Sequence, residues 1–115
     1  MAKDPQAVLE QLKRRAPDIR DALPEVMKGF GSMMQAAEKD GVLTHKTKEL
    51  ITLGIAIAGR CDYCIAAHVA NCLKAGAARE EIMEVCGVAI AMGGGPSYTY
   101  AAFVLDALDA FQPKA

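Results

Sequence analysis

The sequence lacks an excess of charge of either sign. Thirteen basic residues stand against fourteen acidic ones, which leaves a net charge of −1. No global electrostatic field therefore favours nucleic acid or an anionic membrane as a partner. The basic cluster Lys13-Arg14-Arg15 is local, and we interpret it as a solvated face of a helix. We expect neither nucleic acid nor a membrane among the partners of this protein.

The sequence also lacks a long apolar run, including the kind that a signal peptide contains. Residues 1–5 read Met-Ala-Lys-Asp-Pro, and charged or Gly-rich residues interrupt every later apolar stretch. These absences predict a cytoplasmic protein. In that compartment the four cysteines are seldom structural disulfides, and a Cys-x-x-Cys pair is more often redox-active or metal-binding.

Strand patterns are missing as well, because apolar and polar residues do not alternate over any stretch. The 115 residues are expected to form one all-α domain, residues 1–115, of about six helices. A short helix is expected to end before Pro17, since proline interrupts the helical repeat. Further helices are expected to start near Leu23, Thr44, Asp62, Ala77 and Pro96.

The apolar residues of these helices are expected to face a common core. The run Leu50–Ala58 is apolar on nearly all sides, which predicts a helix that is buried all round. Cys72 and Cys86 are interpreted as small buried core residues. In the other helices the predicted inward residues are Val26, Met27, Phe30, Met33, Met34 and Ala37, then Ile82, Val85, Val88, Ala89 and Met92, and finally Tyr98, Ala101, Ala102, Leu105 and Leu108.

Hydrophobic residues are abundant for a chain of this size, at 52% of the 115 residues. A domain this small cannot enclose every apolar helix face by itself. Some of these faces are therefore expected at contacts between subunits, which predicts a homo-oligomer.

The chain contains one compact set of reactive residues. Cys61 and Cys64 are separated by two residues, His68 follows the second thiol by four residues, and Glu49 precedes the first by twelve. Two such thiols can close into a disulfide, and a His at i+4 shares the helix face of Cys64. If the chain turns at Gly59-Arg60 between two antiparallel helices, Glu49 lies within about one turn of His68. A carboxylate, an imidazole and a thiol then form one row.

This row is typical of thiol chemistry. A thiolate attacks one oxygen of a peroxide and becomes a sulfenic acid, which a second thiol converts to a disulfide. His68 is predicted to accept the thiol proton, with Glu49 orienting the imidazole. We predict Cys64 as the attacking sulfur, because it shares a face with His68, and Cys61 as the resolving one. The reverse order stays open, since the first Cys of such motifs gains most from the helix N-terminus.

Other readings of the same residues exist. Zinc could bind Cys61, Cys64, His68 and either Cys72 or Glu49, although three ligands on about one helical turn seldom close a tetrahedron. The Cys pair could instead report oxidation in a non-catalytic oligomeric sensor. Glu49 could pair simply with Lys46 or His45, and His68 could be a core His. The glycines at 93–95 do not form a phosphate loop, because no strand precedes them and no Lys-Ser/Thr follows, and no cofactor is predicted.

Several motifs together resemble the alkylhydroperoxidase D-like proteins of the carboxymuconolactone decarboxylase superfamily. The resemblance covers about residues 24 to 112, the expected core. Its motifs are Lys48-Glu49-Leu50, Cys61-x-x-Cys64-x-x-x-His68, Lys74-Ala75-Gly76, Arg79-Glu80-Glu81-Ile82 and Met92-Gly93-Gly94-Gly95-Pro96.

The resemblance implies an all-helical fold that assembles as trimers or hexamers. It implies an enzyme with thiol peroxidase or disulfide reductase activity on small alkyl hydroperoxides, reduced by a lipoyl-bearing or a thioredoxin-like protein. Glu49, Cys61, Cys64 and His68 would be its proton-relay and redox residues. One departure is Tyr63, where the best-known members have a second His. The decarboxylases of the superfamily lack the Cys pair, which argues against decarboxylation.

Overall fold

The computed structural model describes residues 3–112, and this part of the chain consists of helices, turns and loops without a strand. The all-α prediction and the number of helices are confirmed. The helices are α1 (Pro5–Ala22), α2 (Pro24–Glu38), α3 (His45–Ala58), α4 (Asp62–Lys74), α5 (Arg79–Gly93) and α6 (Gly95–Phe111). Within the described residues, no helix is both long and apolar enough to cross a membrane.

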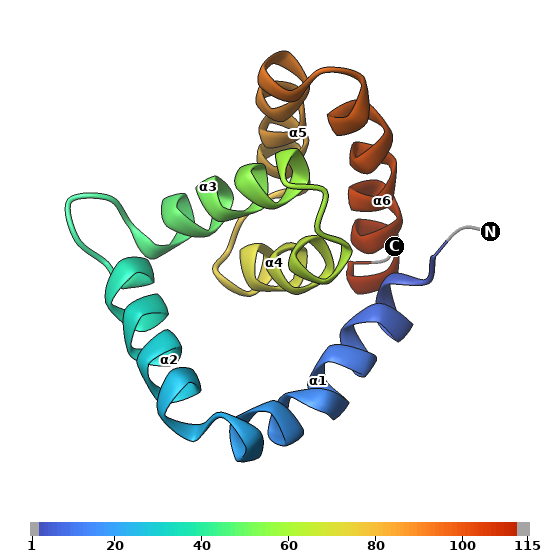
Figure 1. Ribbon diagram of the computed structural model, residues 1–115. Coiled ribbons are helices and arrows are strands. Elements are labelled where there is room, and N and C mark those ends of the chain that lie inside the picture. Colours follow the sequence, from blue (N-terminus) through green and yellow to red (C-terminus); the bar gives the residue numbers. More distant parts are fainter. Residues whose placement is uncertain (1–2, 113–115) are drawn as a thin grey trace.

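The core lies between the last four helices. Helix α3 packs against α4 and α5, and α6 packs against α4 and α5 (Figure 1). Helices α1 and α2 form an arm that leaves this bundle and returns to it, with α1 on α4 and α6 and α2 touching only α1 and α3. The fully buried large side chains come from α3 to α6: Leu53, Ile57, Ile65, Val69, Ile82, Val104 and Leu108.

Local sequence signals explain most helix ends. Asp4 caps α1 by accepting a hydrogen bond from the backbone N–H of Gln6, and Thr44 caps α3 by accepting one from Thr47. Gly93, at the end of α5, is required by a close approach, because a Cβ at this position would clash with Oγ of the buried Ser97. Gly94 follows with a positive φ of 74°, so these two glycines permit the tight α5–α6 corner.

The expectation that a helix ends before Pro17 is wrong. Helix α1 continues through Pro17 to Ala22. A proline inside a helix removes the hydrogen bond to the carbonyl four residues earlier. Both Pro17 and Lys13 are exposed, so water can satisfy that carbonyl and the helix persists.

The predicted inward faces are only partly buried. In α5 and α6 the expected Ile82, Ala89, Ala101 and Leu108 are buried, whereas Val88, Met92, Tyr98 and Leu105 are exposed. The run Leu50–Ala58 is not buried all round, because Ile51 and Ile55 reach the surface. None of the α2 residues is buried, and Phe30 and Met33 are 49% and 60% exposed.

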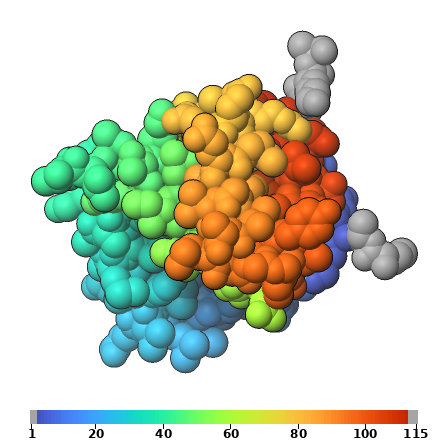
Figure 2. Space-filling view, turned by 90° about the horizontal axis from the view of Figure 1, so that it is seen from above, coloured from blue at the N-terminus to red at the C-terminus, as the bar shows by residue number. Residues whose placement is uncertain are grey.

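Geometry explains this difference between pattern and burial. Helix α2 diverges from the bundle, so its apolar face meets only a short part of α3 (Figure 1). Helix α5 lies at the surface beside α6, as Figure 2 shows from above in orange and red. Periodicity predicts which residues share a face, but not whether another helix of the same chain covers that face.

Candidate functional site

The two sulfurs of the motif lie at the start of α4. Cys61 is the N-cap residue, and its Sγ accepts a hydrogen bond from the backbone N–H of Cys64 at 3.2 Å. A disulfide joins Cys61 to Cys64, with a Cα–Cα distance of 5.2 Å. Both residues are partly buried, and Tyr63 between them is exposed. The pair is therefore oxidised in this structure and lies where a helix N-terminus favours negative charge on sulfur.

The expected hairpin brings Glu49 to His68. Gly59 and Arg60 turn the chain between α3 and α4, with Arg60 in the left-handed region at φ 57°. Oε1 of Glu49 lies 2.9 Å from Nδ1 of His68. Only 4% of Glu49 is exposed, so this hydrogen bond is largely buried. A carboxylate on Nδ1 orients the ring and leaves Nε2 as the nitrogen that can exchange a proton.

The structure does not join the imidazole to the disulfide. Within residues 3–112, no hydrogen bond connects His68 to either sulfur. A disulfide sulfur carries no proton, so the oxidised form needs no base at this position. The pairing of Glu49 with His68 is thus observed, and the contact between His68 and Cys64 stays a prediction for the reduced form.

Two residues near the site were not predicted as part of it. Asn71 places its Nδ2 3.5 Å from Nδ1 of His68. His45, weighed only as a simple partner of Glu49, lies with Nε2 3.9 Å from Glu49 Oε2 while His68 holds the other oxygen. The i to i+4 spacing of His45 and Glu49 was the available signal. Lys46, the other suggested partner, pairs instead with Glu81 at 3.1 Å.

The remaining cysteines are buried free thiols, as predicted. Burial raises the pKa of Cys72 to about 12, and the negative charges of Glu49 and Glu38 add to this effect. Burial likewise raises the pKa of Cys86. Neither sulfur is therefore a nucleophile at neutral pH, which separates them from the Cys61–Cys64 pair.

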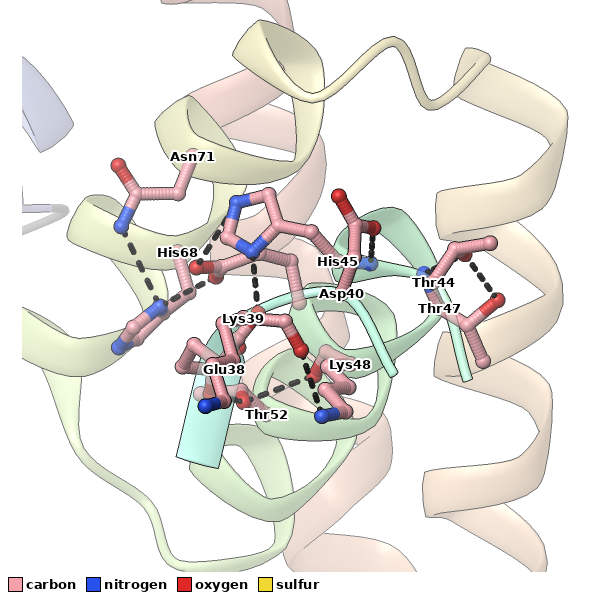
Figure 3. A network of polar contacts seen from close by, with 11 residues as sticks. Glu38, Lys39, Asp40, Thr44, His45, Thr47, Lys48, Thr52, His68 and Asn71 are labelled. Carbon is pink, nitrogen blue, oxygen red and sulfur yellow. Dashed lines mark hydrogen bonds and ion pairs between the residues drawn. The ribbon is translucent and has the colours of Figure 1, made fainter. Parts of the chain in front are cut away.

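An open cavity lies beside Glu49, on the side of His45 and Asn71. Its volume is about 450 Å³, and its walls are His45, Glu49, Asn71, Lys74 and Ala75. Figure 3 shows His45, His68 and Asn71 converging from the two helices α3 and α4. This cavity connects the buried carboxylate to solvent.

The residues considered as alternative zinc ligands do not form a site in this state. Cys61 and Cys64 are joined to each other, and among the described residues the set of three potential ligands that lie together is Glu38, His45 and Glu49. Fold and site together define an all-helical protein with a disulfide-forming Cys pair at a helix start and a buried His-Glu pair beside it.

Comparison with known proteins identifies the family to which this chain belongs. The pattern of the Carboxymuconolactone decarboxylase family matches residues 24–107. A protein of that family from Legionella pneumophila has a structure with TM-score 0.92 and 42% sequence identity, covering 98% of this chain and 100% of that one. An uncharacterised protein of Cupriavidus necator is 36% identical over 110 residues, which are 96% of this chain and 97% of the relative. The chain belongs to the carboxymuconolactone decarboxylase family.

A protein from Thermotoga maritima is also similar, with TM-score 0.85 and 27% identity over 93% of this chain and 94% of that one. A second structure of that protein aligns with TM-score 0.71 and 32% identity, over 75% of this chain and 89% of that one. For the Thermotoga protein an involvement in an antioxidative response is suggested.

Proposed function

We propose that this protein is a thiol-dependent peroxidase or disulfide reductase that acts on small alkyl hydroperoxides. The observation that carries the proposal is the Cys61–Cys64 disulfide at the start of α4. In the same hairpin, His68 of α4 is hydrogen-bonded to the buried Glu49 of α3. Two comparisons support the proposal. The chain belongs to the carboxymuconolactone decarboxylase family, and an antioxidative role is suggested for the similar protein from Thermotoga maritima. A reducing compartment such as the cytoplasm would keep the pair cycling.

The proposed cycle balances with one dithiol as reductant. A thiolate attacks one peroxide oxygen, the O–O bond breaks, and the leaving alkoxide takes a proton to become an alcohol. The second thiol attacks the sulfenic sulfur, which releases water and forms the Cys61–Cys64 disulfide. A lipoyl-bearing or thioredoxin-like protein then reduces the disulfide and supplies the two electrons.

The protein side chains supply proton transfer. We assign His68 as the base that removes a thiol proton, and Glu49 as the residue that orients the ring and stabilises its charged form. We assign Cys64 as the attacking sulfur and Cys61 as the resolving one. The hydrogen bond from Cys64 N–H to Cys61 Sγ favours the opposite order, so the assignment is open to direct trapping.

The proposed active form is a homo-oligomer, a trimer or a hexamer. Helices α3 and α5 leave an open apolar groove of about 460 Å³, whose walls include Ile51, Ile55, Val88 and Met92. Helix α2 presents Val26, Phe30 and Met33 to solvent. Contiguous apolar surfaces of this kind mark protein contacts. Light scattering at micromolar concentration should give about three or six times 12.2 kDa, and a mass near 12.2 kDa contradicts the proposal.

The test of the activity is steady-state consumption of an alkyl hydroperoxide, compared between a lipoyl-bearing domain and thioredoxin as reductant. We expect turnover with at least one of them and none in a Cys61→Ser/Cys64→Ser double variant. Cys86→Ser is the matched control, because it removes a buried thiol outside the site. One equivalent of oxidation without turnover would identify a redox sensor instead.

A further inference from the structure

A second cluster of polar groups adjoins the redox site. Glu38 at the end of α2, His45 at the start of α3 and Glu49 one turn later each direct one potential ligand atom into a common space. These three atoms lie within 4.8 Å of one another. Figure 3 shows His45 above Glu38, joined to its backbone carbonyl by a dashed line, with the imidazole of His68 to the left. The α2–α3 connection folds back so that a residue of the arm reaches the bundle.

The protonation state of His45 follows from its partner. Nδ1 lies 2.7 Å from the backbone carbonyl oxygen of Glu38. A carbonyl oxygen only accepts, so Nδ1 carries the hydrogen and, in the neutral ring, Nε2 carries a lone pair. This lone pair faces Glu49 Oε2 at 3.9 Å, which is too long for a hydrogen bond. Two electron-pair donors that face each other across such a gap are complementary to a cation.

Glu38 and Glu49 each use only one carboxylate oxygen in a hydrogen bond. Oε1 of Glu38 accepts a hydrogen bond from Thr52 Oγ1, but Oε2 is buried and has no partner. Glu49 is 4% exposed, and its hydrogen bond to His68 uses only Oε1. Within residues 3–112, no Lys or Arg forms an ion pair with Glu38 or Glu49. A buried carboxylate without a partner is costly, and a bound cation removes that cost.

From this arrangement we propose that Glu38, His45 and Glu49 form a binding site for a divalent transition-metal ion of the zinc class. One imidazole and two carboxylates are ligands that such ions accept, and an imidazole whose other nitrogen donates to a backbone carbonyl is preorganised for binding. The three ligand atoms lie within 4.8 Å of one another, so small side-chain movements suffice to bring each to about 2.0–2.2 Å from a zinc ion. The remaining coordination position faces the 450 Å³ cavity and takes water.

This site differs from a thiol site for zinc, because it uses none of the cysteines. It shares Glu49 with the redox site, since Oε1 holds His68 while Oε2 faces the ion. The metal site itself does not depend on the proposed peroxidase activity. It can therefore be tested in a protein that has no redox thiols.

The experiment is a calorimetric titration of the full-length Cys61→Ser/Cys64→Ser protein with zinc chloride. We expect one ion per chain with a dissociation constant in the micromolar range or below. Glu38→Gln and His45→Gln, added singly, should each raise that constant at least tenfold. Glu84→Gln is the matched control, because it neutralises an exposed carboxylate on α5 and should leave the constant unchanged.

A spectroscopic measurement separates a built site from loss of folding. Cobalt bound in place of zinc should give visible absorption bands in the starting protein, and these bands should vanish in His45→Gln while its far-ultraviolet circular dichroism stays the same. The proposal is overturned if zinc binds only at millimolar concentration, or if the Glu38 and His45 variants bind it as tightly as the Glu84 control does.

Discussion

The α3–α4 hairpin and helix α2 of the arm both carry many apolar residues, but these residues lie in very different environments. The hairpin buries Leu53, Ile57, Ile65 and Val69 completely, and it largely buries the hydrogen bond between Glu49 and His68. In the arm, Pro5 is buried, whereas Phe30 and Met33 are exposed. Apolar helix faces are thus covered by other helices in one region and exposed to solvent in the other. The difference shows that one chain encloses the surroundings of Glu49 and His68 but leaves much of the apolar surface of α2 uncovered.

The largest expected effect is on the sulfur that reacts with peroxide. Cys64→Ser should lose rapid reaction altogether, because the sulfur that shares a helix face with His68 is gone. Cys61→Ser should still react with one equivalent of peroxide and accumulate a trappable sulfenic acid at Cys64. Mass spectrometry after trapping distinguishes the two. If Cys64→Ser reacts at the wild-type rate and traps at Cys61, the order is reversed and the helix N-terminus is the stronger influence.

The next contrast is between thiols within the bundle. Burial raises the pKa of Cys72 to about 12, so near pH 9 it should hold about a thousandfold less thiolate than an ordinary thiol. Its alkylation by iodoacetamide should therefore be slow in the native protein and fast after unfolding. Because folding raises the pKa of Cys72, its protonated thiol contributes fully to the free energy of unfolding below pH 9. This contribution is lost as the pH rises toward 12. Equal alkylation rates for native and unfolded protein would contradict this burial.

Neutralising the carboxylate of the relay should have a smaller but clear effect. Glu49→Gln removes the charge that orients and stabilises the His68 imidazolium, and peroxide turnover should fall by about a hundredfold or more. Glu81→Gln is a suitable comparison, since it removes a carboxylate that pairs with Lys46 outside the site. The rate of sulfenic acid formation should follow the same order. Wild-type rates in Glu49→Gln would remove Glu49 from the mechanism.

A charged residue placed on an exposed apolar face tests whether that face forms the proposed subunit contact. Ile55→Glu on α3 and Phe30→Glu on α2 should each dissociate the oligomer, because a carboxylate would be buried in an apolar contact. Val42→Glu is the matched control: Val42 is 106% exposed and lies in the loop between α2 and α3. Sedimentation velocity measures the result. If all three variants sediment like the wild type, neither helix face lies in the subunit contact.

The smallest effect is expected at Tyr63. Tyr63 is exposed, and the resemblance to alkylhydroperoxidase D-like proteins implies a second His at this position in the best-known members. If Glu49 and His68 suffice for proton transfer, Tyr63→His should change peroxide turnover by less than about tenfold. Tyr63→Phe controls for loss of the hydroxyl. A gain of tenfold or more would show that a relay through this position limits the natural protein.

Local signals were sufficient for much of the fold. Thr44 predicts the start of α3, and Lys74-Ala75-Gly76 predicts the end of α4, because capping and positive φ are properties of a few neighbouring residues. Pro17 misled the prediction, since its effect depends on whether water reaches the carbonyl left without a donor. The exposure of Ile55 and Met92 could not be predicted from a periodic pattern either, because periodicity does not show whether another helix covers a face.

The sequence by itself determined the spacing of the Cys61–Cys64 pair and the approach of Glu49 to His68 and His45. Spacing within two helices and one short turn defines these distances, because an α helix has a constant rise and rotation. Only the tertiary structure decided that Glu38 joins His45 and Glu49 from α2. The position of Glu38 depends on the path of the loop between α2 and α3. Contacts between distant elements determine that path, and the helical repeat does not.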